Sequence, residues 1–225
     1  MTSIHGLSKH SVGVAFGLSV YSSVAHFVTK DYGGETDYYG GIIRQLTCLA
    51  LLVYVLRRSG RTLKTLGLSF QWTDLPISAL LALGATGAKY LARYALVAGY
   101  GAATGNVLDA HSKAASAFSA AAVLASLVYI CINPFKEELI VRGYFMTELE
   151  YLTKSGFLAV AISVIFQSAY HLYQGPVPAI IHVFGFLVYA VYYQRTRRLT
   201  PVVLAHLYID LWYWGAAAWA YHVGG

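Results

Sequence analysis

The feature that most constrains the fold is a series of apolar runs, each long enough to cross a bilayer. A membrane-spanning helix needs about 20 mostly apolar residues, and such runs recur along the whole of this 225-residue chain. They lie at residues 11–29, 41–56, 75–99, 114–132, 157–173, 176–193 and 199–222. Only 12% of the residues are charged, about half the share found in soluble domains. The pattern predicts a single all-α domain over residues 1–225, a polytopic transmembrane bundle of about seven to eight helices with a buried polar site.

The basic residues indicate orientation in a membrane and not nucleic-acid binding. The net charge is +6, and much of it lies in two short links between apolar runs, at residues 57–64 and 195–198. Short loops rich in Lys and Arg are typical of cytoplasmic loops, whereas a nucleic-acid-binding protein carries its basic residues on a folded soluble face. We therefore expect an integral multi-pass protein with the lipid bilayer as its partner, in the cell (inner) membrane if the source is prokaryotic.

The densest group of charges lies in the stretch NPFKEELIVRGYF (133–145). Asn133 is a favourable N-cap and Pro134 suits the first helical position. These two residues predict that a new helix begins just before Glu137 and occupies the segment 135–153.

The spacing of the charges on this helix predicts different surroundings for its two glutamates. Glu138 and Arg142 are four residues apart, so they share a helix face and can pair. Glu137 is five residues from Arg142, about 140° around the axis. Because ionisable residues at membrane depth are costly and usually mark function, we interpret Glu138 as the partner of Arg142 and Glu137 as the residue left for chemistry.

Two histidine positions complete the candidate site. His171 lies near the end of one apolar run, and His206 and Asp210 lie four residues apart on one face of another. A glutamate and a histidine can activate a water, and a second histidine can donate to the oxyanion of an acyl-transfer intermediate. Alternatively, Glu137, His171 and His206 can bind zinc with water as the fourth ligand, although the HExxH motif is absent. The residues alone leave both mechanisms open.

These residues resemble the motifs of a known family. EELIVRG (137–143) is similar to the EExxxR motif of the CAAX prenyl protease and bacteriocin-processing family of intramembrane endopeptidases. His206 and Asp210 resemble its HxxxN/D motif, and His171 resembles the histidine of its FxxxH motif. The motif-bearing core covers about residues 113–222. The resemblance implies catalytic roles for Glu137, Glu138, His171, His206 and Asp210, and a supporting role for Arg142.

The chain departs from the family pattern at two positions. Gln167 stands four residues before His171, where the motif has Phe, and Phe166 is one place away. Position 210 is Asp and not Asn. An ionised Asp repels an oxyanion, so we expect Asp210 to be protonated, to orient His206 or to help hold a metal.

The basic links and the site residues make conflicting demands on topology. If 135–153 does not cross the membrane, four spans separate the two basic links and both lie inside, but Glu137 and His171 fall near opposite faces. If 135–153 crosses, the two site residues share a level, but the links fall on opposite sides. Chemistry requires Glu137 near His171, so we expect a buried, crossing or re-entrant helix, with one span, such as 114–132, miscounted or tilted.

The sequence therefore predicts a glutamate-dependent intramembrane endopeptidase, acting on a peptide or lipidated-protein substrate. A prenylated CaaX tail, a peptide leader and a membrane protein are all compatible with it. One alternative is a non-catalytic immunity or scaffold protein of the same fold. A second is a small transporter with a proton relay, which would need inverted repeats that the sequence does not show.

Overall fold

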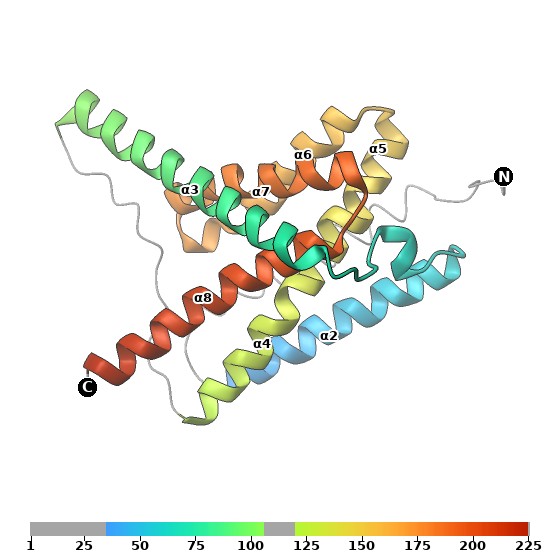
Figure 1. The fold of residues 1–225 in the computed structure, drawn as a ribbon, viewed down its shortest axis with the longest axis horizontal. Helices are drawn as coiled ribbons and strands as arrows, with labels where there is room; N and C mark the ends of the chain where they lie inside the picture. Colours follow the sequence, from blue (N-terminus) through green and yellow to red (C-terminus); the bar gives the residue numbers. More distant parts are fainter. Residues whose placement is uncertain (1–34, 106–119, 225) are drawn as a thin grey trace.

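The computed structural model describes residues 35–105 and 120–224, and every regular element within them is helical (Figure 1). Besides the α-helices there are two short 3₁₀ turns, η1 and η3, and one π-helical segment, η2. In chain order the elements are α2 (Glu35–Arg58), η1 (Leu63–Leu66), α3 (Asp74–Thr104), α4 (Ala120–Glu138), η2 (Leu139–Met146), α5 (Thr147–Thr153), α6 (Gly156–Ala169), η3 (Leu172–Gln174), α7 (Pro176–Thr196) and α8 (Thr200–Gly224).

The all-helical membrane fold is confirmed, but the expected number of helices is wrong. Six α-helices of 14 residues or more lie in the described part of the chain, together with the seven-residue α5. The predicted run 11–29 lies outside the described residues. Three helical stretches are long and apolar enough to cross a membrane: Tyr38–Arg58, Asp74–Thr104 and Pro176–Thr196.

The main reason for the lower count is that the two helices expected at 114–132 and 135–153 form one continuous helix. Helix α4 continues without a break through η2 into α5, so no helix begins at Asn133. Pro134 lies inside α4, a position that membrane proteins tolerate because neighbouring helices satisfy the freed backbone groups. The side chain of Asn133 does not cap a helix; it accepts a hydrogen bond of 3.1 Å from Gln45 on α2.

This merger removes the topological conflict. With α4, η2 and α5 as one continuous helix, four helical stretches lie between the two basic links, and the links meet at the same end of the bundle. Leu199 donates its backbone N–H to Gly67 O at 2.9 Å, and Ser69 N–H donates to Thr200 Oγ1 at 2.9 Å. Gly67 is required here, because it has a φ of 86° and a Cβ would lie 2.0 Å from Arg197 O.

We call this part of the molecule the basic end, and define it as residues 57–74, 147–155 and 193–200. Three ion pairs hold it together: Arg61 with Glu148, Arg197 with Glu150, and Arg198 with Asp74.

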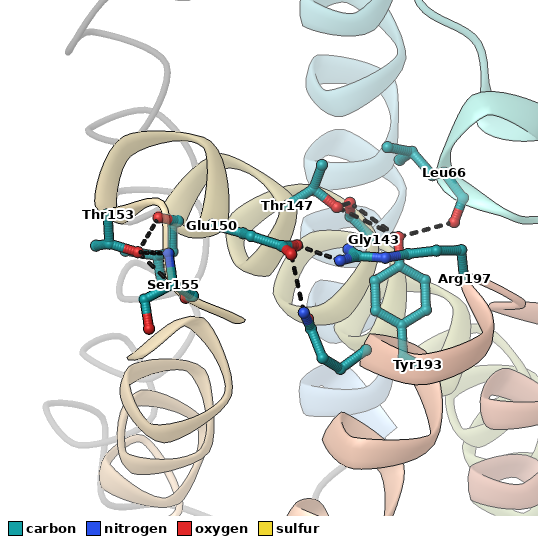
Figure 2. A network of polar contacts seen from close by, with 10 residues as sticks. Leu66, Gly143, Thr147, Glu150, Thr153, Ser155, Tyr193 and Arg197 are labelled. Atoms are coloured by element: carbon teal, nitrogen blue, oxygen red, sulfur yellow. Dashed lines mark hydrogen bonds and ion pairs between the residues drawn. The ribbon is translucent and has the colours of Figure 1, made fainter. Parts of the chain in front are cut away.

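Figure 2 shows the polar network at its centre. The hydroxyl of Tyr193 donates to Leu66 O at 3.2 Å and lies 3.3 Å from Thr147 Oγ1, while Gln194 donates to Glu150 at 2.9 Å. These contacts join α5, α7 and the turn after α2.

The remaining helices enclose the middle of the long α4–η2–α5 helix. Helix α4 packs between α2 and α8, α3 packs on α7 and α8, and α6 packs on α7 and η2 (Figure 1). A hydrogen bond of 2.9 Å from Trp214 on α8 to Ser126 on α4 adds a polar link between two of them. The residues around the α4–η2 junction are buried by this arrangement, from Lys136 to Met146.

Candidate active site

The short helix α6 brings residues distant in sequence to one level of the bundle. Glu137 lies 16 residues before the end of α5 at Thr153, and His171 lies 15 residues after the start of α6 at Gly156. Gln167 on α6 contacts both residues, since its Nε2 lies 3.5 Å from Glu137 Oε2 and its carbonyl oxygen lies 2.8 Å from Nδ1 of His171. The expectation that Glu137 and His171 share a level therefore agrees with the structure.

Glu138, the last residue of α4, is completely buried and holds His206 on α8. Its Oε1 lies 2.8 Å from Nδ1 of His206, so the ring donates this proton to the carboxylate. Sequence spacing predicted Arg142 as the partner of Glu138 and did not indicate His206.

Arg142 is present beside Glu138, but the contact is looser than the spacing predicted. Its Nε lies 3.7 Å from Glu138 Oε2, with both side chains fully buried, and this exceeds hydrogen-bond range. The guanidinium instead donates to Phe186 O at 3.2 Å and lies 5.7 Å from the centre of the Phe186 ring. Residues 139–146 are π-helical, so the 3.6-residue periodicity used to place Arg142 does not hold after residue 138. A π-helical segment is uncommon and often found at functional sites.

Glu137 points to a second set of neighbours and is only 7% exposed. Its Oε1 lies 3.6 Å from Lys136 Nζ, and its Oε2 lies 3.5 Å from Nε2 of Gln167 on α6. The spacing had indicated a Glu137 without partners. The structure gives it two, but both contacts are long. A carboxylate with long contacts in a buried site retains the capacity to take a proton from a bound water.

His171 is oriented by the backbone of α6. Its Nδ1 lies 2.8 Å from the carbonyl oxygen of Gln167. A carbonyl only accepts, so Nδ1 carries the proton and Nε2 of the neutral ring is left as an acceptor. The ring lies against His182 and Phe186 of α7, with centroids 5.0 and 5.1 Å away.

His206 and Asp210 lie on one face of α8, as their spacing predicted. His206 Nε2 is 3.6 Å from Asp210 Oδ1, with side-chain exposures of 11% and 23%. The imidazole thus has a carboxylate near each ring nitrogen, Glu138 closely and Asp210 more loosely.

Gln167, which the motif pattern indicated only as a departure, lies at the centre of the cluster. Its buried amide lies between the two glutamates, with Nε2 3.5 Å from Glu137 and 3.4 Å from Glu138. The signal that could have found it is the one used for the histidines, a polar side chain inside an apolar run four residues from His171. Lys136 was missed as a neighbour of Glu137 for a different reason, since adjacent residues do not usually face each other on a helix.

The zinc alternative is not favoured by the arrangement of side chains. Among the described residues, no three His, Cys, Asp or Glu side chains converge closely enough to hold a metal ion. Glu137, His171 and His206 belong to one buried polar cluster but do not form a ligand set.

Comparison with known families identifies the part of the chain that carries this cluster. Residues 119–212 match the model of a family described as type II CAAX prenyl endopeptidase Rce1-like. The family expected from the motifs is confirmed, and the Rce1-like segment contains every candidate site residue from Glu137 to Asp210. No curated protein and no solved structure matches the chain. The Rce1-like family is a family of proteases, which agrees with the chemistry that the cluster can perform.

Proposed function

We propose that this chain is a glutamate-dependent intramembrane endopeptidase that hydrolyses a peptide bond of a lipidated or membrane-tethered substrate. The observation that carries the proposal is the buried cluster in which two adjacent glutamates of α4 meet His206 of α8 and Gln167 of α6. A non-covalent hydrolase needs a base for water and a donor for the oxyanion. The cluster supplies candidates for both, inside a domain of a protease family.

Glu137 is the proposed general base. It takes one proton from water as the water oxygen attacks the carbonyl carbon of the substrate. When the C–N bond breaks, Glu137 returns this proton to the leaving amine. His171 supports the step, because its Nε2 is the acceptor left by the bond between Nδ1 and Gln167 O and can orient the same water.

His206 is the proposed oxyanion donor. Carboxylates near both ring nitrogens stabilise the doubly protonated imidazole, which donates from both. Nδ1–H is committed to Glu138 at 2.8 Å, whereas Nε2 is 3.6 Å from Asp210, so its proton is available to a developing oxyanion. In this assignment Asp210 orients His206 and does not itself contact the oxyanion, and Arg142 offsets the buried charge of Glu138.

The substrate reaches such a site most directly from the bilayer. A lipid chain holds a peptide at the membrane, so a prenylated CaaX-type tail could reach a cluster buried among membrane helices. Such a substrate also agrees with the description of the matched family. With the basic end on the cytoplasmic side, the substrate would be processed from that face of a cell membrane.

Cleavage of a prenylated reporter peptide by purified protein in detergent tests the proposal. Wild type is compared with Glu137→Gln, and a peptide without the lipid tests whether the tether matters. Cleavage by wild type alone, unaffected by a zinc chelator, supports the glutamate-dependent mechanism. Equal cleavage by the variant contradicts the role of Glu137. Absence of cleavage by wild type, repeated with membrane-protein substrates, contradicts the peptidase and favours a non-catalytic relative.

A further inference from the structure

Gln167 contacts three of the proposed catalytic residues at once, although the family motif has Phe at this position. Its side-chain nitrogen lies 3.5 Å from Glu137 and 3.4 Å from Glu138. Its backbone carbonyl accepts the Nδ1 proton of His171 at 2.8 Å. The side chain is completely buried, so water does not compete for these contacts.

The chemistry of the amide suits this position between two carboxylates. The NH₂ group of Gln has two donors, one for each glutamate. The opposite assignment would turn the amide oxygen toward both carboxylates and is repulsive. Gln167 Oε1 has no hydrogen-bond partner among the described residues, so the amide contacts its neighbours through its donor side alone. The contacts are at the long limit of hydrogen bonds, and such bonds often tighten when substrate binds.

Without this amide, Glu137 has a competing partner. Lys136 Nζ lies 3.6 Å from Glu137 Oε1, and a closer ion pair would remove the carboxylate from the water. The contact of Gln167 with the other oxygen, Oε2, opposes that movement. It also separates Glu137 from Glu138, whose own Oε1 is bound to His206.

The aromatic packing expected at this position is supplied by the preceding residue. The Phe166 ring lies 4.9 Å from that of Phe145 and 6.0 Å from that of Tyr170. Position 167 is therefore not needed for aromatic packing and is available for a polar side chain.

We infer that Gln167 is a positioning residue, whose amide holds the Glu137 and Glu138 carboxylates apart and in place while its carbonyl fixes the tautomer of His171. This inference rests on the proposed function for its catalytic consequence, but not for the contacts themselves. It also explains why a chain with an otherwise matching motif tolerates a polar residue in place of Phe.

The test combines kinetics with a stability cycle, so that the two proposals can fail separately. Gln167→Met keeps nearly the same volume and removes both donors. A hydrogen bond to a charged group is stronger than one between neutral groups. We therefore expect Gln167→Met to lower kcat for a prenylated reporter peptide about tenfold to a hundredfold and to change KM less than twofold. Gln194→Met on α7 is the matched control, since the same replacement at the basic end should leave kcat unchanged.

The stability cycle measures the contact without using activity. Thermal unfolding in detergent is compared for wild type, Gln167→Met, Glu137→Gln and the double variant. We expect the Tm loss caused by Gln167→Met to be at least halved when Glu137 is already Gln, because the charge that the amide holds is gone. Equal Tm losses in the two backgrounds, or a Gln167→Met variant with wild-type kcat, overturn the inference.

Gln167→Asn carries the kinetic test if Gln167→Met does not fold. This variant keeps a buried amide, but its side chain is shorter by one methylene. We therefore expect the same loss in kcat at constant KM, and full activity overturns the inference. If wild type cleaves no substrate, the proposed function fails, whereas the Tm cycle still decides whether Gln167 holds Glu137.

Discussion

The basic end and the buried cluster of Glu137, Glu138, Gln167 and His206 both place carboxylates beside cations, but they differ in how fully each carboxylate is bonded. At the basic end, Asp74 accepts the Gln71 N–H at 2.8 Å with one oxygen and pairs with Arg198 through the other. Glu150 is likewise bonded through both oxygens, to Gln194 and Arg197 (Figure 2).

The buried cluster lacks this saturation. Glu138 Oε2 and the neighbouring Arg142 Nε are buried without hydrogen-bond partners among the described residues. The contacts between Glu138 and Arg142, and between the glutamates and Gln167, range from 3.4 to 3.7 Å. Buried polar groups are almost always satisfied, and exceptions concentrate at functional sites. The difference between the two regions supports the proposal that the saturated ion pairs of the basic end stabilise the fold, whereas the unsaturated carboxylates of the cluster serve chemistry.

Replacing one arginine from each region gives the largest expected contrast. Arg142→Ala strands the fully buried charge of Glu138, and breaking a buried pair in this way costs about 3–5 kcal/mol. Arg197→Ala removes a partner that is 42% exposed, which is worth about 0.2–1 kcal/mol. Thermal or denaturant unfolding in detergent measures both, and equal losses would remove the distinction between the two regions.

His206 provides a contrast in catalysis. Loss of one oxyanion donor typically lowers kcat about 10²- to 10³-fold, so His206→Gln should do so with a peptide substrate. Tyr193→Phe, which removes a buried hydroxyl at the basic end, should reduce stability and leave kcat close to wild type. A His206→Gln variant that folds and cleaves normally would exclude His206 as the donor.

The smallest expected effect is a pH dependence at Glu150. Burial raises the pKa of this carboxyl, but hydrogen bonds from Arg197 and Gln194 and the charge of Arg197 outweigh it, so the pKa lies below its usual value of 4.5. The folded state thus favours the ionised form, and the stabilisation is present above that value and lost as pH falls through the folded pKa. Glu150→Gln should therefore cost about 0.2–1 kcal/mol at neutral pH.

The pH series for this variant is read from unfolding midpoints. The difference between wild type and Glu150→Gln should shrink below pH 4.5. A difference that grows in acid would mean that the Glu150 carboxylate does not stabilise the basic end.

Relations within one helix were predictable from sequence, whereas relations between helices mostly were not. The spacing of His206 and Asp210 placed them on one face of a helix, as the structure has them. The bond between Glu138 and His206 joins residues 68 positions apart, and no periodicity indicates such a partner.

The prediction that a helix begins at Asn133 was wrong for a related reason, because contacts between helices decided the outcome. Local propensity favours a cap at Asn-Pro, but the tertiary contact of Asn133 with Gln45 and the surrounding helices allow α4 to continue. Propensity is a weak guide where packing decides.

The most direct test of the central claim crosses the two regions in one experiment. Glu137→Gln and Glu150→Gln make the same isosteric change, one in the buried cluster and one at the basic end. Each variant is assayed for cleavage of a prenylated reporter and for Tm. We predict that Glu137→Gln folds with a Tm near that of wild type and loses about 10²- to 10⁴-fold in rate, while Glu150→Gln cleaves normally with a slightly lower Tm. A Glu137→Gln variant that cleaves as fast as Glu150→Gln would contradict the account.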